Sequence, residues 1–171
     1  MRRTRIFLGV LLAALTMLAV PGAAQADPTI DIVCVGQEDA TFDPGLRLFE
    51  QDVDIASHID YECIDDTIDS GTTDSGGDDI PLSCLSILFS SSGVWEIVWD
   101  TTATSTFEFD YTVSQSGGQT IMTAIGAITA GEFTGSDAVM TLTGGSFSTQ
   151  TCLFAPGVTD NTSAVTLTIS H

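Results

Sequence analysis

The chain has almost no basic residues outside its first few positions. Three of its four lysines and arginines are Arg2, Arg3 and Arg5, so residues 27–171 contain Arg47 and no lysine. The same segment contains all 23 carboxylates, and one arginine against 23 acids gives it a formal net charge of −22. Such a surface repels nucleic acids and anionic lipids, and it lacks the usual clamps for phosphate or carboxylate substrates. It suits a cationic partner, metal ions or a saline medium. The simplest interpretation is that the excess of acidic residues keeps the protein soluble, because like-charged copies repel each other.

The common motifs of catalysis and metal binding are also missing. The sequence contains no G-x-S-x-G, H-E-x-x-H, P-loop or dinucleotide fingerprint. It has two histidines, His58 and His171, and no C-x-x-C spacing, which argues against zinc. A glycosidase needs just two carboxylates, yet no pair is singled out among the 23. We therefore predict no catalytic residue and no metal ligand.

Helical periodicity is absent after residue 26. No segment there shows apolar residues at i, i+3, i+4 and i+7, and Thr, Ser, Gly and Val abound. About eight or nine short alternating runs with turn residues between them are typical of an all-β protein. We predict a single domain over residues 27–171, an antiparallel β-sandwich of immunoglobulin-like general shape, with a small β-barrel as the alternative.

The first 26 residues resemble a secretion signal. A basic start is followed by an apolar run from Ile6 to Val20 and by the A-x-A site Ala24-Gln25-Ala26. The apolar run is too short for a comfortable membrane span. We predict a signal helix over residues 1–26 that is cleaved after Ala26, and general secretion rather than the twin-arginine route. The mature chain is then extracellular and has no membrane span.

Four cysteines lie in the exported part, and all are expected to form disulfides. In an oxidising compartment an even number indicates two bridges, with three possible connectivities. The sequence favours Cys63–Cys84, which would close the Asp-rich segment between them, and Cys34–Cys152, which would tie the first strand to the C-terminal part. The other two connectivities stay open.

The most regular pattern is an aromatic hairpin over Val94–Val113. Its two runs place both tryptophans of the chain, with Phe107, Phe109 and Tyr111, on one face at period two. We expect that face to form a wall of the core. If Trp99 pairs with Phe107, Glu96 lies opposite Asp110; if Trp99 pairs with Ser105, Glu96 lies opposite Glu108. Either register places two carboxylates side by side on the outer face, where they repel each other. A cation or basic partner could relieve this repulsion.

A second clean strand is predicted from Val53 to Cys63. Inward Val, Ile, Ser, Tyr and Cys residues alternate with acidic residues and His58, so this histidine is expected on the solvated face. Before it, Phe42 and Leu46 flank a Pro-Gly turn and are predicted to lie in the core.

The segment Asp65–Asp79 has no periodicity and contains six aspartates and three glycines. We predict an exposed loop there, followed by a buried strand over Ile80–Ser90. Flexible Asp- and Gly-rich loops can supply calcium ligands, although the D-x-[DN]-x-[DN]-G pattern is absent. A calcium ion at Asp65–Asp79 is therefore the one candidate cofactor, and a mobile solvated loop is the simpler interpretation.

Several short motifs resemble those of a group of small secreted actinobacterial proteins. These motifs are Phe42-Asp43-Pro44-Gly45-Leu46, Ser83-Cys84-Leu85, Trp99-Asp100, Thr104-Ser105-Thr106 and Gly131-Glu132-Phe133-Thr134-Gly135. The resemblance covers most of residues 27–171 and implies secretion and a β-rich fold. It implies no activity and assigns no functional residue.

Three functional hypotheses follow from the sequence. The first is a secreted, non-catalytic, acidic module that acts in an extracellular or envelope interaction. The second is a calcium-dependent module for binding, with carbohydrate as a candidate ligand. The third is a secreted hydrolase, which would need a carboxylate pair in a cleft.

Overall fold

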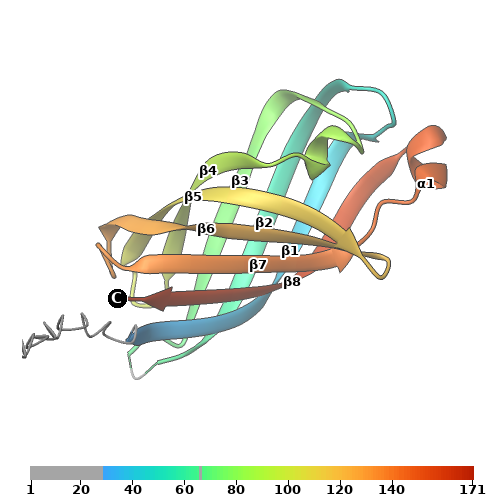
Figure 1. Cartoon of the computed structure of the whole chain (residues 1–171). Coiled ribbons are helices and arrows are strands. Elements are labelled where there is room, and N and C mark those ends of the chain that lie inside the picture. Colours follow the sequence, from blue (N-terminus) through green and yellow to red (C-terminus); the bar gives the residue numbers. More distant parts are fainter. Residues whose placement is uncertain (1–28, 66) are drawn as a thin grey trace, which may run out of the picture.

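Eight antiparallel strands close into a barrel in which every strand pairs with its neighbours along the chain and β8 returns to β1 (Figure 1). The computed structural model describes residues 29–65 and 67–171, so the predicted signal segment 1–26 lies outside the described residues. The strands are β1 (Ile30–Leu46), β2 (Gln51–Ile64), β3 (Ser70–Leu82), β4 (Ser91–Trp99), β5 (Thr104–Ser116), β6 (Gln119–Gly131), β7 (Asp137–Gly145) and β8 (Val158–Ser170).

The small barrel expected as an alternative is therefore confirmed, and the immunoglobulin-like sandwich is not what the structure shows. Both architectures need the same inward and outward alternation, so periodicity alone does not separate them. The difference lies in one long-range pairing, in which Cys34 faces Leu167 and Glu38 faces Ser163 across β1 and β8. This pairing closes the sheet on itself.

Alternation along each strand decides what lies inside the barrel. In β2, the side chains of Val53, Ser57, Ile59 and Tyr61 are buried, and the residues between them are exposed, apart from Ile55, which is half-buried. In β1, Phe42 and Leu46 are 5% and 0% exposed, which confirms both as core residues. The predicted Pro-Gly turn between them is instead an irregular stretch near the end of β1.

The aromatic hairpin forms as predicted in its faces, but its register differs. Ile97, Trp99, Phe107 and Phe109 are buried inside the barrel. Trp95 pairs with Phe107, so Glu96 lies opposite Thr106 rather than opposite a carboxylate. The predicted like-charge pair across this hairpin was therefore wrong, because the turn lies closer to Trp99 than either predicted register required, while the parity of the two strands is unchanged.

The Asp-rich segment is also different from the prediction. Most of it belongs to β3, which pairs with β2 from Ser70 to Leu82, and the connection before it is short. Backbone pairing with a regular neighbour outweighs the low strand propensity of Asp and Gly. Asp65 turns the chain there, since its Oδ1 accepts from the backbone N–H groups of Thr67 and Ile68 at 2.8 and 3.1 Å.

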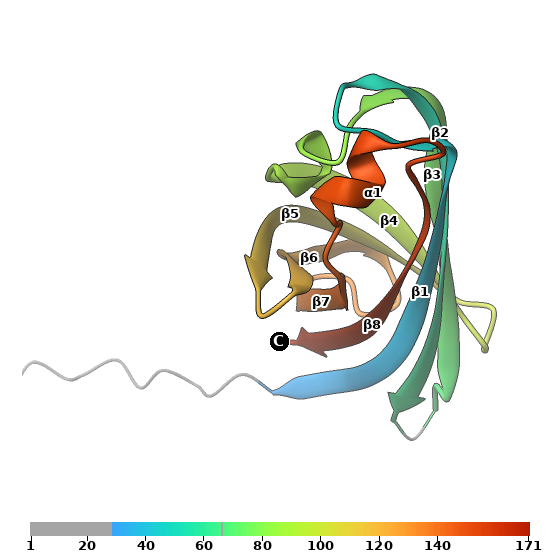
Figure 2. The same ribbon diagram turned by 90° about the vertical axis from the view of Figure 1, so that its right-hand side faces the viewer.

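The segment that follows is not the strand predicted over Ile80–Ser90. Strand β3 ends at Leu82, and a short 3₁₀ helix, η1 (Ser86–Leu88), precedes β4. One short α-helix, α1 (Thr149–Leu153), interrupts the chain between β7 and β8. Figure 2 shows α1 at one end of the barrel, and we call this the α1 end. Among the described residues no helix is long and apolar enough to cross a membrane.

Two disulfides are present, but the predicted connectivity was wrong. The bridges are Cys34–Cys63 and Cys84–Cys152. Cys34 and Cys63 face each other in the β1–β2 register, at the barrel end away from α1. Cys84 follows β3, whose 13 residues span roughly 40 Å, so Cys84 lies at the α1 end together with Cys152. Each predicted bridge would have had to span the length of the barrel.

Candidate ligand-binding cavity

The barrel is fully packed at one end and contains a cavity nearer the other. Away from α1, apolar side chains from every strand except β3 form a packed core that includes Tyr61, Trp99, Phe107 and Met140. A second, smaller buried cluster surrounds the second disulfide at the α1 end. Towards α1, the interior contains a cavity of about 400 Å³. Closed barrels of eight strands are just wide enough to be filled by side chains or to hold one small ligand, and this barrel does both.

One wall of the cavity is apolar and largely aromatic. Trp95, Phe109 and Tyr111 approach it from the β4–β5 hairpin, and the Trp95 and Phe109 rings meet edge to face with centroids 4.9 Å apart. Met122 and Leu142 continue this wall on β6 and β7. The aromatic face recognised in the sequence therefore lines the packed core in its deeper part and the cavity in its outer part.

The opposite wall is polar and centres on Glu38. Strand β1 presents its even-numbered residues to the interior, which places Glu38 between the buried Cys34 and Ala40. Ser57 Oγ donates to Glu38 Oε1 at 2.8 Å, and Ser163 also hydrogen-bonds this carboxylate. Asn161 Nδ2 donates to Ser163 Oγ at 3.0 Å. Three strands thus build one hydrogen-bonded group around a single carboxyl.

Burial changes the acidity of this group. Loss of water around Glu38 raises the pKa of its carboxyl, while the hydrogen bonds with Ser57 and Ser163 act in the opposite direction. The neighbouring Asp39 raises it a little further. Next to Glu38, burial also raises the pKa of the Tyr61 hydroxyl, which lies 3.3 Å from Thr73 Oγ1 and stays protonated at neutral pH.

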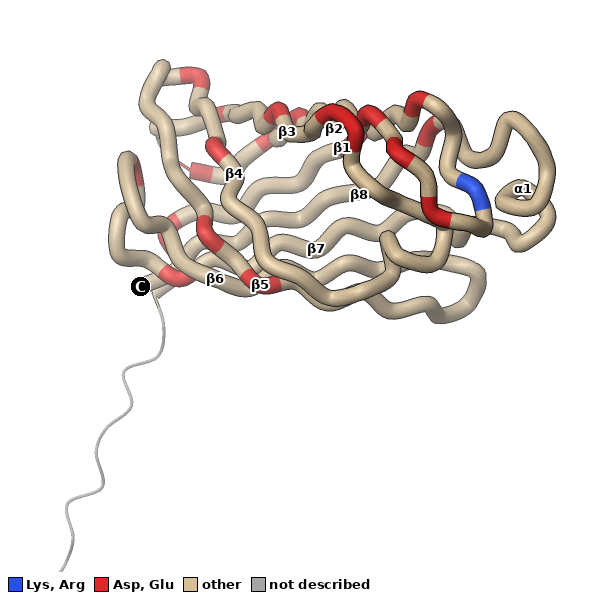
Figure 3. The backbone as a smooth tube through the Cα atoms, turned by 90° about the horizontal axis from the view of Figure 1, so that it is seen from above, with Lys and Arg blue, Asp and Glu red and all other residues tan. Residues whose placement is uncertain are grey.

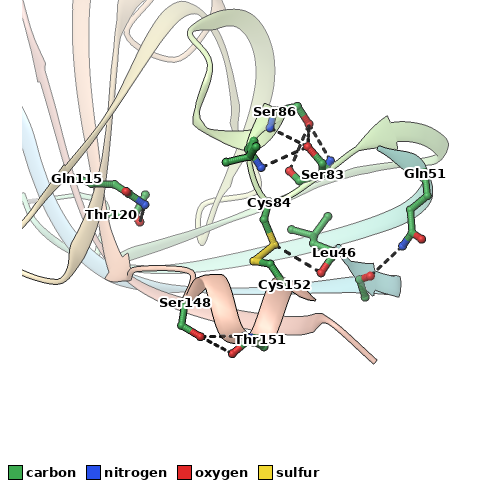
Figure 4. Close-up of a disulfide and its surroundings, with 12 residues drawn as sticks. Leu46, Gln51, Ser83, Cys84, Ser86, Gln115, Thr120, Ser148, Thr151 and Cys152 are labelled. Carbon is green, nitrogen blue, oxygen red and sulfur yellow. Dashed lines mark hydrogen bonds between the residues drawn. A yellow bond between two sulfur atoms is a disulfide. The ribbon is translucent and has the colours of Figure 1, made fainter. Parts of the chain in front are cut away.

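Three loops meet at the α1 end, where the second disulfide joins two of them (Figure 4). Cys84–Cys152 links the β3–β4 loop to α1. The backbone N–H groups of Leu48 and Cys84 donate to the carbonyls of Cys152 and Arg47 at 2.9 and 2.8 Å. Ser148 caps α1 by accepting from the Thr151 N–H at 3.0 Å. These contacts give the cavity end a fixed frame.

A wide separation between two strands contributes to the opening. Strands β3 and β4 pair only at Gly71–Trp99 and Thr72–Val98. Beyond these positions Ser75 and Ile80 of β3, and Gly93 of β4, line the cavity without pairing across the seam. Backbone pairing therefore does not close the barrel wall beside the cavity.

The loops around the opening are apolar and nearly uncharged. Exposed side chains there are Phe49, Leu85, Phe89, Leu153 and Phe154. Residues 80–95 and 138–159 contain no charged side chain at all. Figure 3 shows Asp and Glu along the strands and turns of the barrel and the single basic segment on the α1 side. Arg47 and Glu50 lie in the β1–β2 loop. The negative charge of the protein is thus carried mainly by the barrel wall.

The functional candidates of the sequence, His58 and the described aspartates of Asp65–Asp79, do not line the cavity. His58 is on the outer face as predicted, with its Nδ1 2.6 Å from Asp74 Oδ1 and its Nε2 3.3 Å from Asp60 Oδ1. The hydrogen bond with Asp74, helped by Asp60, raises the pKa of His58. In the described part of the chain no three His, Cys, Asp or Glu side chains are grouped so as to hold a metal ion.

Sequence reasoning missed Glu38 because this residue lies beyond the first clear strand pattern, which covers Thr29–Val35. The local signal was nevertheless present. If the strand is continued at period two from Ile32 and Cys34, it reaches Glu38, Ala40 and then Phe42 on the same face. A carboxylate on the apolar face of a strand is unusual and marks a candidate site.

Comparison of the chain with protein-family models, with curated proteins and with solved structures finds no match. The cavity is therefore the feature of the molecule from which a function can be inferred.

Proposed function

We propose that this protein is a secreted, non-catalytic binding protein that holds a small, mainly apolar ligand inside its barrel. The observation that supports this proposal is the cavity of about 400 Å³, with its aromatic wall and the hydrogen-bonded polar group around Glu38. Ligand sites usually have volumes of about 300–1,000 Å³, with apolar linings and a few polar groups that orient the ligand.

Binding fits this cavity better than catalysis does. Of the described residues that line it, Glu38 is the one with a charged side chain. Hydrolysis of a glycoside commonly needs two carboxyl groups on either side of the bond, and the described lining has one. The described lining also has no histidine, lysine or cysteine that could form one of the usual nucleophile–base pairs with its serines.

An extracellular location agrees with the chemistry of the barrel. All four cysteines of the barrel are paired in disulfides, and disulfides form and persist in oxidising compartments. A carrier outside the cell would keep an apolar molecule dissolved in water, and the acidic wall would keep carrier molecules apart. Calcium-dependent binding, with carbohydrate as ligand, stays a prediction without an observation in its favour, since most of the Asp-rich segment is strand β3.

The proposal is tested with a neutral dye whose emission rises in apolar surroundings, N-phenyl-1-naphthylamine, titrated into the mature protein. We expect saturable binding with one dye per chain, together with quenching of tryptophan emission, because Trp95 lines the cavity. The test variant is Ala40→Phe, which adds a ring at a buried, cavity-lining position. Its matched control is Thr41→Phe, because Thr41 is exposed on the outer face of the same strand.

Ala40→Phe should weaken dye binding at least about tenfold, whereas Thr41→Phe should leave it unchanged within about twofold. Ser75→Phe, which fills the cavity from β3, serves as a second plug if Ala40→Phe does not fold. Thermal melts show which variants are folded. Equal dye affinity in both folded plug variants and in the wild type would place the dye outside the barrel and contradict the proposal.

A further inference from the structure

Within the described part of the chain, the carboxyl of Glu38 has hydrogen-bond donors around it and no positively charged side chain. Ser57 and Ser163 hydrogen-bond it, and Asn161 supports Ser163. All three are neutral. In addition, Ser75 lines the same cavity, so the polar wall offers several hydroxyl and amide groups around one carboxyl.

The rest of the described chain supplies no counter-ion either. Arg47 is the one lysine or arginine in that part, and no ion pair joins it to Glu38. His58 and His171 lie on the outside, where they pair with Asp74, Asp60 and Asp31. Glu38 is half-buried, and a carboxylate that has lost part of its water without gaining a counter-ion is costly. A bound cation would offset that cost.

We propose that the ligand of the barrel is a cationic amphiphile, an organic ammonium ion with a compact apolar body, whose ammonium group binds Glu38. The inference rests on the proposed binding function and narrows its ligand class. The ammonium protons would be donated to the Glu38 carboxylate and to the oxygens of Ser57 and Ser163. The apolar body would pack against the wall formed by Trp95, Phe109 and Tyr111.

The overall charge of the protein also favours a cation over a neutral or anionic ligand. The carboxylates of residues 27–171 produce a negative field that concentrates cations near the molecule and repels anions such as fatty acids. A bound ammonium would also bring the raised pKa of Glu38 down again, because a nearby positive charge favours the ionised carboxyl.

The experiment compares three probes that share one rigid hydrocarbon cage and differ in one group. These are 1-aminoadamantane, which is an ammonium ion at neutral pH, 1-adamantanol and 1-adamantanecarboxylate. Their binding to the mature protein is measured by calorimetry at pH 7 and a fixed physiological salt concentration. We expect the ammonium to bind roughly tenfold to a hundredfold more tightly than the alcohol, and the carboxylate to bind more weakly than both.

Two charge-removing variants separate direct contact from the general field. Glu38→Gln keeps the shape of the side chain and removes the charge inside the cavity. Asp39→Asn removes one charge from the adjacent, exposed position on the outer face. Glu38→Gln should lower the affinity for the ammonium to about that for the alcohol, and it should change the affinity for the alcohol by no more than about twofold. Asp39→Asn should change neither affinity by more than about twofold.

The outcomes distinguish this inference from the proposed function. Suppose that the alcohol and the neutral dye bind inside the barrel, but that the ammonium binds no more tightly than the alcohol, or still binds more tightly in Glu38→Gln. The proposed ligand class is then wrong, and the binding function stands. A preference for the alcohol would mean that Glu38 acts as a neutral hydrogen-bond donor, which also overturns the inference. If neither the dye nor any adamantane probe binds, both proposals fail.

Discussion

Trp99 shows how one residue links the hairpin to the packed half of the barrel. Its side chain is 2% exposed, and its indole Nε1 donates to Ser105 Oγ at 2.9 Å. Ser105 in turn donates to the Glu132 carbonyl at 2.7 Å, which joins the hairpin to the β6–β7 turn. Gly71 leaves room for the ring, because a Cβ at that position would lie 2.7 Å from Trp99 Cε3.

Replacing Trp99 with Ala should lower the free energy of unfolding by about 3–5 kcal/mol, because it opens a cavity in the core and removes the partner of Ser105. Chemical denaturation of the mature protein measures the change. Val98→Thr is the matched control, since Val98 is 42% exposed on the outer face, and it should cost about 0.5 kcal/mol or less. A loss below roughly 1 kcal/mol for Trp99→Ala would contradict the inward placement.

At the scale of elements, the two disulfides have different tasks. Cys34–Cys63 joins adjacent residues of two strands that already pair over most of their length. Cys84–Cys152 joins a loop and a short helix that no strand pairing connects. The first bridge reinforces a ladder, whereas the second holds the cavity end together.

Non-reduced peptide mapping should therefore recover Cys34–Cys63 and Cys84–Cys152 linked peptides. The bridges span sequence separations of 29 and 68, for which the chain-entropy model gives roughly 3.5 and 4.5 kcal/mol of stabilisation.

We expect Cys84→Ala/Cys152→Ala to lower stability and also to weaken dye binding, because the cavity frame loosens. Cys34→Ala/Cys63→Ala should lower stability and leave dye affinity within about twofold. The reverse pattern would contradict the division of tasks.

For the whole molecule, charge is the dominant long-range term. A formal charge of −22 over residues 27–171, with one arginine, makes the folded state repel itself. Added salt screens this repulsion, since the Debye length falls from about 30 Å at 0.01 M to about 10 Å at 0.1 M.

The melting temperature should therefore rise by several degrees between low and moderate sodium chloride, with potassium chloride acting alike. Calcium chloride at matched ionic strength tests the calcium hypothesis in the same experiment. A rise well beyond that of sodium at millimolar calcium would indicate a calcium site, because a ligand bound to the folded state alone raises its stability. A melting temperature that does not change with salt would contradict self-repulsion.

Local alternation in the sequence determined which side chains face inward. Trp95, Ile97 and Trp99, and the run from Val53 to Cys63, all lie on the predicted faces. The even number of cysteines likewise determined that disulfides form. These properties need no knowledge of distant neighbours, because the side chains of a strand alternate at period two wherever the strand pairs.

Long-range pairing decided the rest. Contact between β1 and β8 turns the sheet into a barrel rather than a sandwich, and pairing with β2 makes most of the Asp-rich segment a strand. The end of the barrel at which each strand stops determines which cysteines can meet. Glu38 becomes a cavity residue because β1 continues to Leu46 beside β8. Each of these outcomes depends on segments far apart in the sequence, whose pairing local periodicity does not encode.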